Sequence, residues 1–143
     1  MGHPATPSGR TFGIRAPFGA AANLSFELTQ DAGNYAVGAA SPFAAPRSMV
    51  ASGLFDWAQS TNATRVLGRV DGAQQTLSFA SSAGTLTSGN FASRKLHLFA
   101  RGGTSQPFLG WFFGSLIKGA TLSASQIALA ERWLASKTKT VTL

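Results

Sequence analysis

The last third of the chain, residues 96–143, restricts the fold most, because two strand patterns there lead into a capped amphipathic helix. In LHLFAR, at 96–101, leucine and alanine alternate with other residues, which is the period of a β-strand with one apolar face. Gly102 and Gly103 then turn the chain into PFLGWFFGSLI at 107–117, whose large apolar side chains fall at both parities. A strand that is apolar on both faces is predicted to lie inside a packed β structure.

A helix is predicted at about residues 124–137. Ser123 and Gln126 form a capping-box pattern, because the serine oxygen can accept from an unpaired N–H at the helix start while the glutamine reaches back. Five apolar residues share one side of this helix and are expected to face the core: Ile127, Leu129, Ala130, Trp133 and Leu134. Glu131 and Arg132 fall on the opposite side, which is predicted to face solvent.

Composition favours one all-β domain without membrane insertion. The chain of 143 residues is long enough for one substantial core and too short for two ordinary domains. Hydrophobic residues make up 44% and charged residues 12%, with 16 glycines, a profile that suits short strands and tight turns. No apolar run approaches the roughly 20 residues needed to cross a bilayer. Cysteine is absent, which excludes disulfides and thiolate metal sites.

The chain before residue 96 is predicted to form the other walls of the same sandwich. Residues 1–22 are expected to be a flexible or docking N-terminal arm, with a short strand in TFGIRAPF as the alternative, and residues 23–143 the domain itself. LSFELT alternates cleanly and is predicted to be a strand with a hairpin partner in NYAVGAA. Further strands are expected around Gly53 and on both sides of an Asp71–Gly72 turn, with the return strand reaching Phe79.

Five pieces of the sequence resemble a known family. They are VDG at 70–72, LHLFARGG at 96–103, PFLGWFFGSL at 107–116, LSASQIALAERWLASKT at 122–138 and VTL at 141–143. Together they resemble the C-terminal end of concanavalin A-like lectin/glucanase (laminin G-like) jelly rolls, in the version common in virion proteins of bacteriophages and prophages. The resemblance implies an all-β, concanavalin A-like jelly-roll sandwich with a short C-terminal amphipathic helix. Complete members carry more N-terminal strands, so we expect an open edge that another subunit, or the N-terminal arm of a symmetry mate, covers.

The acidic residues do not form a catalytic or metal-binding pattern. They are Glu27, Asp31, Asp56, Asp71 and Glu131. Glycoside hydrolysis needs two carboxyl groups, and no two of these reproduce the clustered Glu-x-Asp-x-x-Glu pattern of the family's glucanases. Glu27 is expected on the outward side of its strand, Asp71 in a turn and Glu131 on the solvated side of the helix. The protein is therefore predicted not to be an enzyme, and to hold neither a metal nor a cofactor.

The loop around Trp57 is the best candidate for glycan binding. Sugars present an apolar C–H face and a ring of hydroxyl groups, so a glycan site needs an aromatic platform beside amide or carboxylate groups. The candidate residues are Trp57, Asp56, Gln59 and Asn62, with Tyr35 and Asn34 as a second set. The alternative for Trp57, which we favour, is a core or interface side chain.

The resemblance predicts a non-catalytic structural or binding protein of a phage virion, made in the host cytoplasm. It would be a capsid decoration, head fibre, or tail or baseplate component that docks on other virion proteins as a homo-oligomer or hetero-assembly. Host-surface glycans are a further candidate ligand. One alternative is a free carbohydrate-binding module or degraded glycosidase. A second is a basic nucleic-acid-associated protein, suggested by the net charge of +7 but disfavoured because the basic residues are dispersed.

Overall fold

Within the residues that it describes, the computed structural model of the chain contains seven β-strands, one four-residue helix and a longer C-terminal helix. The described residues are 11–18, 23–30, 35–40, 43, 47–79, 86–87, 112–138, 141 and 143. In chain order the elements are β1 (Thr11–Phe18), β2 (Asn23–Thr29), β3 (Tyr35–Ala39), β4 (Ala51–Phe55), α1 (Asn62–Arg65), β5 (Val66–Val70), β6 (Ala73–Gln74), β7 (Ser78–Phe79) and α2 (Ala124–Ala135).

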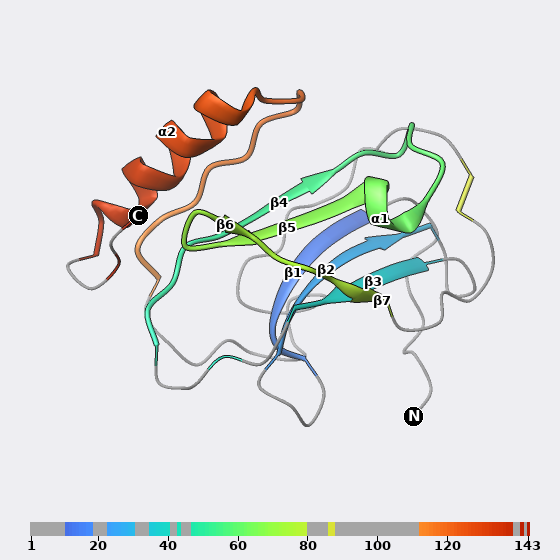
Figure 1. Cartoon of the computed structure of the whole chain (residues 1–143), viewed down its shortest axis with the longest axis horizontal. Coiled ribbons are helices and arrows are strands. Elements are labelled where there is room, and N and C mark those ends of the chain that lie inside the picture. Colours follow the sequence, from blue (N-terminus) through green and yellow to red (C-terminus); the bar gives the residue numbers. More distant parts are fainter. Residues whose placement is uncertain are drawn as a thin grey trace.

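The strands form two antiparallel sheets that pack face to face. The four-stranded sheet has the order β1-β2-β3-β7, and the three-stranded sheet has the order β4-β5-β6. Figure 1 shows α2 beyond β4 and β5, on the side away from the four-stranded sheet. The predicted β-rich fold with a short C-terminal helix is confirmed at this level.

β2 supplies the inner face of the four-stranded sheet. Leu24, Phe26 and Leu28 alternate along it and are between 0% and 3% exposed, as the sequence pattern predicts. Its neighbours are β1 and β3, which place Ile14 and Gly38 opposite Phe26. The predicted hairpin between LSFELT and NYAVGAA is therefore confirmed as β2–β3.

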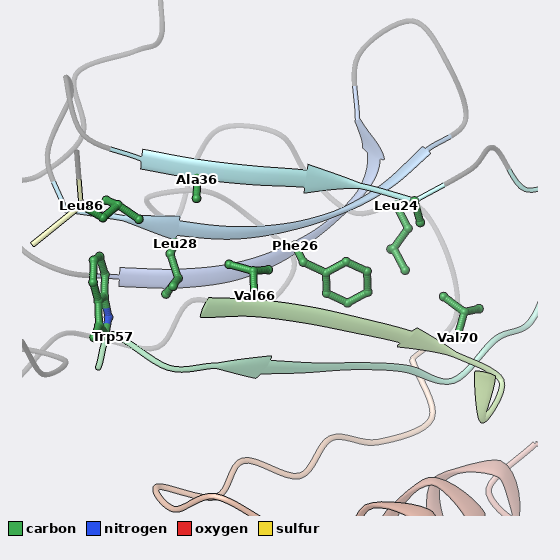
Figure 2. Close-up of a cluster of buried hydrophobic side chains, with 9 residues drawn as sticks. Leu24, Phe26, Leu28, Ala36, Trp57, Val66, Val70 and Leu86 are labelled. Atoms are coloured by element: carbon green, nitrogen blue, oxygen red, sulfur yellow. The ribbon is translucent and has the colours of Figure 1, made fainter. Parts of the chain in front are cut away.

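Phe26 fills the space between the two sheets because the facing strands carry glycine beside its ring. A Cβ atom on Gly68 of β5 would lie 2.4 Å from the Phe26 ring, and one on Gly53 of β4 would lie 3.2 Å from it. Figure 2 shows the ring between β2 and β5, with Val66 and Val70 on either side of it. The buried residues of this cluster are Leu24, Phe26, Leu28, Ala36, Ala40, Trp57, Val66, Val70 and Leu86.

Asp71 and Gly72 make the turn between β5 and β6, as predicted. Both have positive φ, 48° and 79°, the pattern of a type I′ turn, whose twist suits a β-hairpin. The Asp71 carboxylate fixes the turn, because it accepts from the Val50 backbone N–H at 2.8 Å and pairs with Arg47. After β6 the chain crosses to the other sheet, where β7 pairs with β3. The return strand predicted to reach Phe79 therefore belongs to the four-stranded sheet.

α2 begins where the capping box predicts but turns a different side toward the sheets. The Gln126 backbone N–H donates to Ser123 Oγ at 3.3 Å, and Gln126 Oε1 accepts from the Ser123 N–H at 2.9 Å. The predicted core-facing stripe is wrong for Leu129 and Trp133, which are 60% and 49% exposed, whereas Ile127, Ala130 and Leu134 are half-buried. Glu131, predicted to face solvent, is buried, because donors from β4 and β5 hold its carboxylate.

The second of the two predicted C-terminal strands is wrong over residues 112–118. This stretch has no regular structure and runs beside α2 instead of joining either sheet (Figure 1). Four large apolar residues in it are about half exposed: Phe112 at 49%, Phe113 at 49%, Leu116 at 57% and Ile117 at 53%. The other predicted strand, at 96–101, and residues 107–111 lie outside the described part of the chain.

β1 occupies part of the predicted N-terminal arm and is the short-strand alternative for TFGIRAPF. It pairs antiparallel with β2, placing Phe12 opposite Leu28 and Ile14 opposite Phe26. The four-stranded sheet therefore begins at residue 11 and not at residue 23. Phe12 and Ile14 of the predicted arm lie on its inner face. Residues 1–10 and 19–22 lie outside the described residues.

Gly68→Ala is expected to destabilise the protein by about 1–3 kcal/mol, because the added methyl group would overlap the Phe26 ring in a filled core. Gly13→Ala is the matched control. A Cβ atom on Gly13 meets nothing within 4 Å, so its free energy of unfolding should change by less than about 0.5 kcal/mol. Urea denaturation measures both values. Equal stability of the two variants would contradict the close packing of Phe26 on β5.

Candidate functional site

The loop from β4 to β5 carries the first predicted glycan set and turns its tryptophan inward. The Asp56 backbone N–H donates to the Arg65 carbonyl at 2.8 Å, which closes the base of the loop. Thr61 caps α1 through a capping box with Thr64. Trp57 is 2% exposed and lies at one end of the core cluster (Figure 2). This is the core setting that we favoured for Trp57 from the sequence.

The polar residues of this loop bond to one another. One Asp56 oxygen accepts from the Ala58 backbone N–H and the other from the Gln59 side chain, both at 2.9 Å. The hydrogen bonds from Gln59 and Ala58 lower the pKa of Asp56. Asn62 is half-buried at the start of α1. Because the Trp57 ring is buried, it provides no exposed platform beside these groups, and sugar binding at this loop stays a prediction.

The second predicted glycan set cannot be located in the described residues, and these residues contain no candidate metal site. Tyr35 begins β3 opposite Thr29, but its side chain and all of Asn34 lie outside the described part of the chain. Within that part, no three His, Asp or Glu side chains are grouped so as to hold a metal ion. No helix among the described residues is long and apolar enough to cross a membrane.

Glu131 of α2 lies against the outer face of the three-stranded sheet. Ser52 of β4 and Arg69 of β5 are cross-strand partners, so their side chains reach the same face. Arg69 Nε donates to Glu131 Oε1 at 2.8 Å and Arg69 Nη2 donates to Oε2 at 3.1 Å, while Ser52 Oγ also donates to Oε1. Arg69 further donates to the Gly72 carbonyl. We call Glu131, Arg69 and Ser52 the Glu131 centre, because it ties α2 to both strands and to the hairpin turn.

The Glu131 centre keeps its carboxylate ionised. Burial acts to raise the pKa of Glu131, but hydrogen bonds from Arg69 and Ser52, with the charge of Arg69, outweigh burial and hold that pKa below its usual value. The hydrogen bond with Glu131 raises the pKa of Arg69. At neutral pH the centre therefore holds an ionised carboxylate paired with Arg69, and this contact attaches α2 to the sheet.

A cavity of about 210 Å³ lies between α2 and the β5–β6 turn. Its lining residues are Arg69, Gly72, Ala128, Glu131, Arg132 and Leu143. Glu131 is the one acidic side chain among them, whereas hydrolysis of a glycosidic bond uses two carboxyl groups. Among the described residues, the lining therefore lacks the pair of side-chain acids that this chemistry requires.

Within the described residues, β1 and β4 are end strands of their sheets, and we call the side where they meet the open edge. Among the described residues, β1 pairs only with β2 and β4 pairs only with β5. Phe12 and Ile14 of β1 face the interior, since cross-strand partners share a face and theirs are the buried Leu28 and Phe26. Both are nevertheless 41% exposed. The centre of the Phe12 ring lies 5.2 Å from that of Phe55 at the end of β4, so the two sheets meet at this edge.

Charge is distributed unevenly over the described residues. Three ion pairs join Arg15 to Glu27, Arg47 to Asp71 and Arg69 to Glu131. Glu27 lies on the face of β2 opposite that of Phe26, which is the outer side of the strand, as predicted. Arg65 is buried, with 5% of its surface exposed. The cations that are exposed and form no ion pair in the described part of the chain are Lys118, Arg132 and Lys137. All three belong to the C-terminal segment, close to its exposed apolar residues.

Comparisons with known proteins find no match: no family model, no curated protein and no solved structure matches this chain. The likeness to concanavalin A-like jelly rolls therefore stays a prediction from the sequence. What the geometry adds is the open edge, the Glu131 centre and the exposed C-terminal segment.

Glu131→Gln is expected to lower the free energy of unfolding by about 2–3 kcal/mol, because it leaves the Arg69 guanidinium without its counter-charge. The Arg69 side chain is 28% exposed, which keeps the loss below that of a fully buried pair. Arg132→Gln changes the next residue, which is exposed, and should alter stability by less than about 0.5 kcal/mol. Urea denaturation of both variants is the measurement, and a loss no larger for Glu131→Gln than for Arg132→Gln would contradict the role of the centre.

Acid is expected to weaken the fold through the same carboxylate. Since folding lowers the pKa of Glu131 from 4.5, its contribution to stability is complete above pH 4.5 and is lost as the pH falls through the folded-state value. Thermal melts of the wild type from neutral pH to below 4.5 should show this loss. Glu131→Gln lacks the titrating group, so its melting temperature should fall less steeply. Parallel slopes for the two proteins would contradict the assignment.

Proposed function

We propose that this protein is a non-catalytic structural or binding protein of a phage virion, built on a concanavalin A-like jelly-roll sandwich. It serves as a capsid decoration, head fibre, or tail or baseplate component and docks on neighbouring virion subunits. The observation that carries the proposal is the open edge, where Phe12 and Ile14 face the space between the sheets yet remain 41% exposed.

An edge of this kind favours association with another chain. The last strand of a sheet offers unpaired backbone N–H and C=O groups, which another extended segment can pair with. Here β1 and β4 are both last strands within the described residues, and apolar side chains lie between them. A strand from a neighbouring subunit would satisfy the backbone groups and cover Phe12 and Ile14 in one step. The sequence resemblance supports this reading, because complete jelly rolls of that family carry more N-terminal strands.

Host-surface glycans remain part of the proposal as a further ligand of the β4–β5 loop. Glycan binding at this loop is supported by Asp56, Gln59 and Asn62, which place carboxylate and amide groups within one loop. A site of this composition would bind sugar hydroxyl groups by hydrogen bonds, without stacking on Trp57.

Virions purified from the source strain are expected to contain the protein at a fixed copy number, measured by quantitative mass spectrometry. Ile14→Lys places a charge at the open edge and should lower incorporation by about tenfold, since an edge lysine blocks strand pairing. Ala73→Lys is the matched control, because Ala73 is exposed on β6, at the opposite edge of the three-stranded sheet. It should be incorporated like the wild type.

Two results would contradict the proposal. One is absence of the protein from purified particles. The other is a wild-type protein that light scattering shows to be a stable, non-aggregating monomer and that binds no partner. Such a monomer would not need another chain to cover its open edge.

A further inference from the structure

Six large apolar side chains are exposed in the C-terminal segment, and we call them the C-terminal apolar surface. They are Phe112, Phe113, Leu116, Ile117, Leu129 and Trp133, each between 49% and 60% exposed. Scattered single apolar residues are normal on a protein surface, but six large ones within 22 consecutive residues indicate an interaction site.

The two stretches that contribute these residues lie side by side. A Cβ atom on Gly114 would lie 3.8 Å from a methyl group of Leu134, so the stretch at 112–118 runs against α2. Figure 1 shows it running along the helix before the chain turns into α2, which forms the outermost layer of the molecule. Glu131 holds one side of α2 on the sheet, and Leu129 and Trp133 therefore remain on the exposed side.

The exposed charged side chains within residues 112–138 are all positive. Lys118, Arg132 and Lys137 are exposed, and Lys137 Nζ lies 4.7 Å from the centre of the Trp133 ring. Glu131 is the only acidic residue between 112 and 138, and it is buried and paired with Arg69. The surface thus combines aromatic and aliphatic side chains with cations, and residues 112–138 contribute no exposed acidic side chain to it.

We infer that the C-terminal apolar surface binds the surface of an anionic phospholipid bilayer. A bilayer interface accepts Trp, Phe and Leu side chains at the boundary between head groups and acyl chains, while its phosphate groups attract Lys and Arg. Both requirements are met by the exposed side chains of α2 and of the stretch that runs along it. The protein lies on the bilayer and does not cross it. The inference is independent of the proposed virion function, because the open edge of β1 and β4 takes no part in it.

The test is co-sedimentation of the full chain with vesicles of phosphatidylcholine and phosphatidylglycerol, and with vesicles of phosphatidylcholine alone. We expect binding to the anionic vesicles that weakens as salt is added, and weak or no binding to the neutral ones. Lys118→Gln with Lys137→Gln removes two cations and should lower the affinity by about 25-fold. Leu129→Gln with Trp133→Gln should lower it by at least about tenfold, through the loss of apolar burial.

The matched control is Ile14→Gln, which removes an exposed apolar side chain from β1 and should leave lipid binding unchanged. Circular dichroism verifies that every variant is folded, so that a loss of binding is not a loss of structure. Brominated lipids should quench Trp133 fluorescence, and Trp133→Phe identifies its share of the signal. Absence of binding to anionic vesicles, equal binding to neutral ones, or self-association that depends on Trp133 would each overturn the inference. The last of these would identify a second copy of the chain as the occupant.

Discussion

The contact between the Glu131 carboxylate and the donors of Arg69 and Ser52 determines how the C-terminal segment is arranged. A carboxylate can be buried in a protein only when a counter-charge and hydrogen bonds replace the water that it loses. The outer face of the three-stranded sheet offers both at one place, because Arg69 and Ser52 are cross-strand partners. Binding Glu131 there fixes the rotation of α2 about its axis. Leu129 and Trp133 are consequently exposed, so the part of the apolar surface that α2 contributes follows from one ionic contact.

Features with a local cause were predictable from the sequence. The alternation in LSFELT predicts β2 because successive side chains of a strand point to opposite faces, and its apolar residues Leu24, Phe26 and Leu28 are buried in the core. The Asp71–Gly72 turn needs two residues that tolerate positive φ, and both have it. The start of α2 needs a side chain that bonds its first N–H groups, and Ser123 with Gln126 supplies it. Each of these depends on residues close together in the chain.

Features that depend on distant partners were not predictable in the same way. Counting apolar positions along α2 places Trp133 toward the core, but the count contains nothing about the donors on β4 and β5 that bind Glu131. The inward position of Val66 and Val70 does predict that Arg69 points outward, which is the one signal in the sequence for the Glu131 centre. For Phe12, the sequence leaves a short strand and a docking arm as alternatives, and its place at the end of a sheet depends on how the strands pair.

The open edge and the C-terminal apolar surface can be occupied at the same time. Phe12 and Ile14 face the space between the two sheets, whereas Glu131 attaches α2 to the outer face of the three-stranded sheet. A neighbouring subunit that adds a strand at β1 or β4 would extend a sheet sideways and would not cover the exposed side of α2. The two proposals therefore use separate parts of the fold: the assembly that we propose uses the edge of β1 and β4, and the lipid binding that we infer uses the side of α2 that faces away from the Glu131 contact.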